Sequence, residues 1–299
     1  MSNNIFTRFI LSVISLLLVS LCIASYTINE KTSQLTLNSN PTSSSLQAGL
    51  LIDRDCSSIN CSDTISPLRN RGNEFLLRCK YISPQIMNVT IQWVYGANSK
   101  ERDYNLVCWQ SSEIGRIQDT IATKKIDSKK PISVLSFDNL NMKKFEYTVA
   151  LQIRDSSSED FYNYPVSVHI PMVVEDKNRI DQSWESNNQT RVIPFNFTDD
   201  VFRCSYEIPN GNFPKRMSNY IVLFKGGMTP NFNKIKIEDF TSLIRVKQSY
   251  GGEHVNIDLH LETTLERQKL YTLAYLMGDK AETVPNPNGL VAWITFIAN

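Results

Sequence analysis

Histidine and the short motifs of catalysis are scarce in this chain. Among 299 residues only three are histidines, His169, His254 and His260. His254 and His260 are six positions apart, so on one strand they would share a face but lie roughly 20 Å apart, too far for one metal ion. The chain also lacks a Gly-x-Ser-x-Gly elbow, a phosphate-binding glycine loop and a His-Glu-x-x-His motif. We therefore expect no catalytic residues, no metal site and no cofactor.

An excess of charge of either sign is also absent. The formal net charge is +1 at pH 7, whereas a nucleic-acid footprint needs a basic stripe or patch. The two Lys-Lys runs at 124–125 and 129–130 are expected to form one solvated loop. Acidic pairs at 159–160 and 199–200 are of the type that serves glycoside hydrolysis or calcium binding. Because both pairs lie in loop-like stretches, we interpret them as solvated turn residues and expect no nucleic-acid partner.

Long apolar runs are limited to one, at the N-terminus. Arg8 precedes an apolar run over residues 9–24 that ends in small residues, which is typical of a secretory signal peptide. The run is also nearly long enough to span a bilayer as an uncleaved signal anchor. We expect residues 1–25 to be a cleaved leader, with the anchored form, a type II surface protein, as the alternative. A membrane is an expected partner only in the anchored case.

Four Asn-x-Ser/Thr sequons agree with export through an oxidising compartment. They begin at Asn60, Asn88, Asn188 and Asn196. Together with the leader they predict a secreted, extracellular glycoprotein, with all four asparagines as glycosylation candidates.

Cysteine is limited to six residues, one of them inside the apolar run. The spacing of Cys56 and Cys61 suits a small local disulfide loop. Two interpretations stay open for the others. Cys79 and Cys204 are buried thiols that pack as small apolar side chains, or Cys79 pairs with Cys108 and Cys204 stays free, which an oxidising compartment favours. A free Cys204 would allow a disulfide-linked homodimer.

From residue 75 onward the chain consists of short runs of alternating polarity separated by turns, the pattern of β-strands. The expected strands are 75–81, 89–95, 104–109, 132–137, 145–153, 166–170, 201–206, 220–224, 270–274 and one within 289–299. Several such runs at this spacing predict an all-β sandwich or barrel.

An internal repeat of about 125 residues links the two halves of the chain. Cys79 precedes Tyr147 by 68 positions, and Cys204 precedes Tyr271 by 67. Each tyrosine begins a similar Tyr-Thr-x-Ala segment, and a last strand follows about 19 positions later. A period of this length indicates a duplicated domain, since solenoid repeats are shorter.

The expected domain boundaries follow from composition and from the repeat. Residues 26–72 are rich in Ser, Thr and Asn and are expected to be a flexible segment. Residues 73–176 and 198–299 are the two expected β-sandwich domains. The polar stretch 177–197 between them is expected to be a linker.

The repeat resembles the immunoglobulin-like and fibronectin type III superfamily. Tyr147 and Tyr271 match the tyrosine corner of that superfamily, and Trp93, 14 positions after Cys79, matches its buried tryptophan on the third strand. Neither half has the second cysteine of the family's disulfide. The resemblance implies two tandem antiparallel sandwiches that present loops from a rigid scaffold.

One loop carries three aromatic residues that are candidates for partner contact. Phe161, Tyr162 and Tyr164 follow an acidic, Ser-rich turn in the first repeat, and tyrosine is favoured at interfaces. We expect a non-enzymatic module that binds another protein or a cell-surface receptor in adhesion or as a receptor-like ectodomain. The alternatives are a structural coat or matrix protein and, least favoured, a β-sandwich enzyme.

Overall fold

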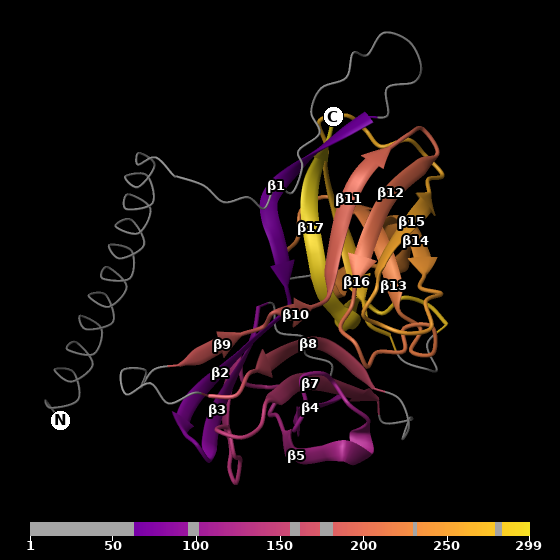
Figure 1. Ribbon diagram of the computed structural model, residues 1–299. Helices are drawn as coiled ribbons and strands as arrows, with labels where there is room; N and C mark the ends of the chain where they lie inside the picture. Colours follow the sequence, from indigo (N-terminus) through magenta and orange to yellow (C-terminus); the bar gives the residue numbers. More distant parts are fainter. Residues whose placement is uncertain (1–62, 95–101, 156–161, 174–181, 230–231, 279–282) are drawn as a thin grey trace, which may run out of the picture. The chain divides into compact units, whose positions relative to one another are not determined.

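The computed structural model is built from antiparallel strands and short turns (Figure 1). It describes residues 63–94, 102–155, 162–173, 182–229, 232–278 and 283–299, all within one unit, Ile59–Asn299. In these ranges the helical turns are short 3-10 segments: η1 (Ile117–Asp119), η2 (Phe232–Lys234), η3 (Ile237–Asp239) and η4 (Pro287–Gly289). None of the described helices is long and apolar enough to cross a membrane. The chain is therefore all-β with several antiparallel sheets, and the expected leader lies outside the described residues.

Fourteen of the strands fall into two sets of seven. The first set is β2 (Phe75–Ser83), β3 (Ile86–Trp93), β4 (Arg102–Trp109), β5 (Thr120–Lys125), β6 (Ile132–Phe137), β7 (Tyr147–Asp155) and β8 (Asn163–Ile170). The second set is β11 (Arg191–Phe197), β12 (Val201–Glu207), β13 (Tyr220–Lys225), β14 (Phe240–Arg245), β15 (His254–His260), β16 (Leu270–Leu276) and β17 (Leu290–Ala298).

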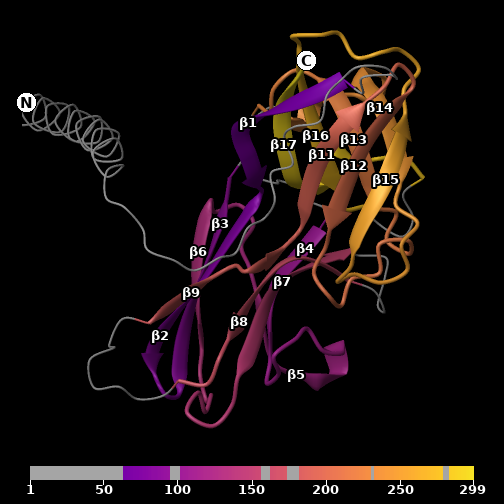
Figure 2. The ribbon, with the colours of Figure 1, turned by 45° about the horizontal axis from the view of Figure 1, so that its top comes forward.

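The two sets pair their strands in the same order. We number the strands of each set from one to seven in chain order. In both sets, strands five, two and one lie side by side in that order, and strands seven, six, three and four lie side by side in that order. In the first set these groups are β6-β3-β2 and β8-β7-β4-β5, and in the second they are β15-β12-β11 and β17-β16-β13-β14. Figures 1 and 2 show the strands of each group lying next to one another. The duplication seen in the sequence is thus matched by a duplicated strand order.

Alternation of side chains produces the core of each set. On β2, Phe75, Leu77 and Cys79 are buried, while the residues between them are exposed, because successive side chains point to opposite faces. These residues share one buried cluster with Leu106 of β4 and Val149 of β7 from the other sheet. Two sheets that bury their inner faces against a common core are compatible with a β-sandwich.

The strand β1 (Asp63–Asn73) joins the second set although it precedes the first in sequence. Its first residues pair with β11, and the rest pairs antiparallel with β17 from Ile65↔Ala298 to Asn73↔Ala292, as Figures 1 and 2 show. Ten of these eleven residues fall in the segment 26–72 that we expected to be flexible. The composition of that segment gave no sign of the strand, because β1 lies between β17 and β11 and is held by main-chain pairing with both.

The expected linker 177–197 also contains strands. Here β9 (Ser183–Glu185) pairs with the edge of β2, and β10 (Asn188–Gln189) pairs with the edge of β8. The strand β11 then begins the second set at Arg191, seven residues before the expected boundary at 198. The strands β9 and β10 therefore cover the edges of two sheets.

The structure also shifts the expected repeat by one strand in its N-terminal half. Phe75 and Tyr147, 72 positions apart, begin the first and sixth strands of the first set, whereas Val201 and Leu270, 69 positions apart, begin the second and sixth strands of the second. Cys79 therefore lies on a first strand and Cys204 on a second strand. Trp93 ends the second strand β3, and the tryptophan on the third strand is Trp109. The sequence did not reveal this one-strand shift, because the distance from Cys79 to Tyr147 is almost the same as the distance from Cys204 to Tyr271.

Tyr147 and Tyr271 occupy equivalent places in the two sets. Each lies at the start of the sixth strand, and its phenol oxygen accepts a hydrogen bond from a main-chain N–H a few residues upstream. The donors are Asn141 at 2.7 Å and Glu266 at 2.9 Å. This contact ties the preceding loop to the strand, as in a tyrosine corner.

The expected disulfide between Cys79 and Cys108 is not formed. Both residues are fully buried in the same core cluster as free thiols, and Cys204 is a third buried thiol. Burial raises the pKa of Cys108 to about 12 and raises that of Cys79 and Cys204 as well. All three therefore pack as small apolar side chains, and a bond through Cys204 to a second chain would require the core to open. Cys56 and Cys61 lie outside the described residues.

Candidate functional site

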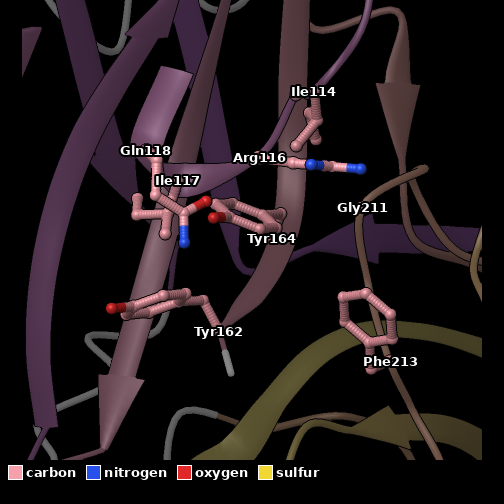
Figure 3. A pocket seen from close by; sticks show the side chains of 9 residues that line it. Ile114, Arg116, Ile117, Gln118, Tyr162, Tyr164, Gly211 and Phe213 are labelled. Carbon is pink, nitrogen blue, oxygen red and sulfur yellow. The ribbon is translucent and has the colours of Figure 1, made fainter. Parts of the chain in front are cut away.

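A pocket of about 420 Å³ lies beside the outer face of the sheet β10-β8-β7-β4-β5 (Figure 3). We call it the aromatic pocket. It is lined by Ile114, Gly115, Arg116, Ile117, Gln118, Tyr162, Tyr164, Gly211 and Phe213. Its size falls within the range of ligand sites, roughly 300–1,000 Å³, and such sites combine an apolar lining with a few polar groups.

The base of the aromatic pocket is a second apolar cluster, separate from the core. Val107, Trp109, Ala150 and Tyr164 are buried there, on the face of β4, β7 and β8 opposite to the core. The rings of Trp109 and Tyr164 meet edge to face with centroids 5.6 Å apart. The indole N–H of Trp109 donates to the main-chain oxygen of Arg116 at 2.9 Å, so the tryptophan also holds the 114–118 segment that forms one wall.

The opposite wall comes from the turn between β12 and β13, which is anchored by Asn212. The side chain of Asn212 accepts from the Tyr164 N–H at 2.7 Å and donates to the Tyr164 carbonyl at 2.9 Å and to the Pro209 carbonyl at 2.8 Å. The neighbouring Gly211 has φ +82°, and a Cβ there would lie 2.5 Å from Ile114. Glycine is therefore required by both its backbone conformation and the close approach of the two walls.

The two tyrosines of the pocket differ in environment. Tyr164 is buried, and its ring centroid lies 6.4 Å from that of Tyr162, which is half-buried. Burial raises the pKa of Tyr164 to about 12, against the lowering effect of a hydrogen bond from Gln152. The phenol therefore remains neutral at physiological pH and serves as part of the base, while Tyr162 presents an accessible ring.

The polar groups of the aromatic pocket are positively charged or neutral. Arg116 and Gln118 are exposed, and among the described residues the Arg116 guanidinium has no hydrogen bond or ion pair. A second guanidinium, that of Arg216, lies 5.8 Å from the ring centroid of Phe213. The pocket thus combines exposed aromatic and aliphatic surface with a cation that is available to an acidic group.

The structure brings together part of the predicted contact loop. Tyr162 and Tyr164 both line the aromatic pocket, and Phe161 lies outside the described residues. Sequence reasoning did not identify Arg116 or Phe213, since they lie about 50 positions from that loop in either direction. The Pro-Asn-Gly-Asn run at 209–212 was the available signal, because it predicts a tight turn, but nothing in the sequence says which strand that turn meets.

The described sequons differ in accessibility. Asn188 is exposed on β10, which leaves it open to modification. Asn88 is half-buried, and its side-chain oxygen accepts a hydrogen bond from the Ser136 hydroxyl at 2.6 Å. The side-chain oxygen of Asn196 is buried and has no hydrogen-bond partner among the described residues. Asn60 lies outside them.

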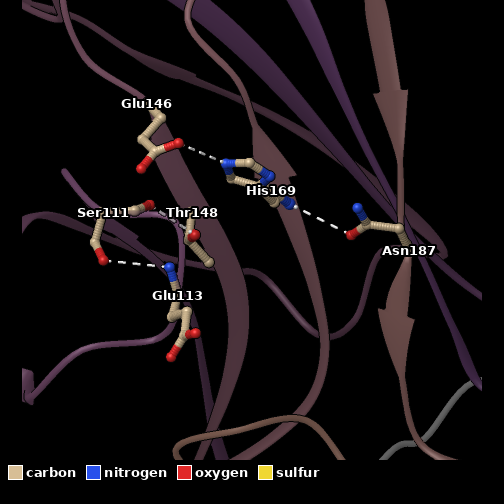
Figure 4. Close-up of polar contacts among 6 residues, drawn as sticks. All are labelled: Ser111, Glu113, Glu146, Thr148, His169 and Asn187. Atoms are coloured by element: carbon tan, nitrogen blue, oxygen red, sulfur yellow. Dashed lines mark hydrogen bonds and ion pairs between the residues drawn. The ribbon is translucent and has the colours of Figure 1, made fainter.

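A second polar cluster surrounds His169 (Figure 4). Its Nε2 lies 3.2 Å from a carboxylate oxygen of Glu146, and its main-chain N–H donates to Asn187 at 3.4 Å. The nearby Thr148 hydroxyl donates to the main-chain oxygen of Ser111 at 2.8 Å. Among the described residues no hydrogen bond joins the imidazole to either hydroxyl, so the cluster does not form a nucleophile and base pair.

The other acidic and histidine candidates stay apart. Asp199 and Asp200 are exposed in the turn before β12, where Thr198 donates to the Asp200 carboxylate at 3.1 Å. His254 and His260 both lie on the edge strand β15, and His254 contacts Glu207 at 3.0 Å. Within the described ranges no three His, Cys, Asp or Glu side chains gather in a metal-binding cluster. The acidic pair at 159–160 lies outside these ranges.

No family model matches the chain, and a search of curated proteins finds no similar sequence.

Proposed function

We propose that this chain is a secreted or cell-surface glycoprotein made of two tandem immunoglobulin-like or fibronectin type III-like sandwiches, and that it binds another protein without catalysing a reaction. Each set divides seven strands into groups of three and four, a division found in immunoglobulin-like sandwiches. The tyrosine contacts at Tyr147 and Tyr271 also support this assignment. The leader-like N-terminus and the sequons support export.

The aromatic pocket is the observation that carries the binding role. Aromatic rings and arginine are enriched among the residues that dominate binding energy at protein interfaces. Tyr162 and Phe213 offer such rings, and Arg116 adds a cation without a partner among the described residues. An apolar or aromatic partner side chain in the pocket, next to an acidic group facing Arg116, would use all of these features.

Selection of peptides tests this role. Random peptides displayed on phage are panned on the intact secreted protein, and selected peptides are measured against the variants Tyr162→Ala and Phe145→Ala. Phe145 is a matched control, because it is exposed and does not line the pocket. We expect Tyr162→Ala to weaken binding about tenfold or more, equivalent to a loss of about 1.4 kcal/mol. Equal binding to both variants, or failure to select any peptide, would contradict the proposal.

Export is tested separately by the intact mass of the secreted protein, measured before and after glycan removal and reduction. A mass that begins near Ser25 or Tyr26 and carries glycans is expected. A mass that retains Met1 would support the signal-anchored alternative, and an unglycosylated protein retained in the cell would contradict export.

A further inference from the structure

The strand β6 ends the sheet β6-β3-β2-β9 with an open edge. It pairs with β3 from Met87↔Phe137 to Gln92↔Ile132, and no other described strand pairs with it. An edge strand presents a row of main-chain N–H and C=O groups that another strand can bind. The edge of β6 is therefore available for pairing.

The side chains of β6 do not protect this edge. Ile132 and Val134 are exposed to 51% and 60%, and they continue on the outer face of the sheet toward Leu76, which is 47% exposed. The strand itself contains no charged residue and no proline. Natural edge strands usually carry such residues to prevent pairing with other chains.

The equivalent strand of the second set shows the usual protection. This strand, β15, has the same rank and the same pattern of burial, with Leu259 buried where β6 has Phe137. At the positions that correspond to Ile132, Val134 and Ser136, it carries His254, Asn256 and Asp258. Two strands of the same rank therefore differ at their exposed edges, which are polar on β15 and apolar on β6. This difference points to a role for the edge of β6.

We propose that β6 pairs antiparallel with β6 of a second copy of this chain, in a two-fold dimer centred on Val134. In this register Ile132 lies opposite Ser136 of the second copy, so the outer faces of the two sheets become continuous. Complementary charges at the two ends of β6 favour this register and favour a second copy of the same chain as the partner.

The complementary charges lie four positions on either side of Val134. Lys130 and Asp138 are both exposed and flank β6, which runs from Ile132 to Phe137, so this register brings Lys130 of each copy near Asp138 of the other just beyond the paired strands, twice by symmetry. Asp138 has no ion pair among the described residues, and the contact of Lys130 with Asp127 is long, at 3.8 Å. A two-fold interface requires a self-complementary surface, and this arrangement provides one.

Sedimentation velocity of the intact secreted protein over a range of concentrations tests the proposal. We expect a reversible monomer–dimer equilibrium and a dimer dissociation constant at least about tenfold higher for Val134→Lys. The matched control is Asn256→Lys on β15, which should leave the dimer unchanged. The thermal unfolding of each variant shows whether it is folded, so a change in assembly can be separated from unfolding.

Charge reversal tests the register. Lys130→Asp places like charges opposite each other and should weaken the dimer, and Lys130→Asp combined with Asp138→Lys should restore it. A protein that stays monomeric at every concentration, a dimer that tolerates Val134→Lys, or a dimer linked by disulfides on non-reducing gels would overturn the proposal. This readout is independent of peptide binding at the aromatic pocket, so the two proposals stand or fall separately.

Discussion

Replacing Asn212 by alanine tests the anchor of the aromatic pocket. The Asn212 side chain is 1% exposed and makes three hydrogen bonds, two to the main chain of Tyr164 and one to that of Pro209. Tyr164 lies where the register between β7 and β8 shifts, between Leu151↔Val166 and Ile153↔Asn163. Asn212 therefore supplies the pairing that the neighbouring strand does not give to Tyr164.

The alanine variant leaves three buried main-chain groups without this partner, the N–H and C=O of Tyr164 and the C=O of Pro209. Each such group costs about 1–3 kcal/mol, and water that enters from the adjacent pocket will recover part of that. We expect a loss of about 2–4 kcal/mol in the free energy of unfolding. For a protein of this size that corresponds to a fall in melting temperature of about 5–15 °C.

Asn212→Asp is expected to be at least as destabilising. The carboxylate still accepts from the Tyr164 N–H, but it faces the carbonyl oxygens of Tyr164 and Pro209, which need a donor. Denaturant unfolding of the intact protein measures both losses, and Asn256→Ala, exposed on β15, is the control, expected to change stability by less than about 0.5 kcal/mol. If Asn212→Ala were as stable as this control, the reasoning would be refuted, because the Asn212 amide would then not be holding the turn between β12 and β13 against Tyr164.

Two further predictions concern buried titratable groups. Burial raises the pKa of Tyr104 and Tyr164 from 10.0 to about 12, so the folded state favours the neutral phenols; the resulting stability is fully present below pH 10 and is lost as the pH rises through 12. We expect alkaline unfolding in that window, with tyrosinate absorbance and circular dichroism changing together, whereas ionisation of these tyrosines near pH 10 with the fold intact would contradict it. The thiols of Cys79, Cys108 and Cys204 should be alkylated only after denaturation, as mapped by peptide mass, and labelling of any of them in the native protein would show that the core is open.

Much of the all-β fold could be predicted from the sequence, because a strand with one buried face leaves a period of two in its polarity. The segments 75–81 and 104–109 lie within described strands for this reason. The strands β1 and β10 could not be predicted, since they are held by main-chain pairing with β17 and β8 and need no apolar pattern of their own. The position of each strand within its set could not be predicted either. Loops of different length made β2, the first strand of one set, appear equivalent to β12, the second strand of the other.

The aromatic pocket could be predicted only in part, for a similar reason. Tyr162 and Tyr164 stood out as aromatic residues in a loop, which is a local signal. Asn212 could not be connected with Tyr164, because an asparagine in a Pro-Asn-Gly-Asn turn is explained locally by the turn itself. Its second role depends on a break in pairing between β7 and β8, and the position of that break is a property of the folded sheet.

The treatment of sheet edges gives the β6 proposal its weight. The edge of β8 is covered by β10, that of β17 by β1 and that of β2 by β9. Among the uncovered edge strands, β5 carries Lys124 and Lys125, β14 carries Arg245, and β15 carries His254 and Asp258. Coverage or polar side chains thus recur at these edges, as expected for a protein that must not pair through them. Against this background an apolar, uncharged β6 with opposite charges placed symmetrically about Val134 is best explained by a second strand that binds there.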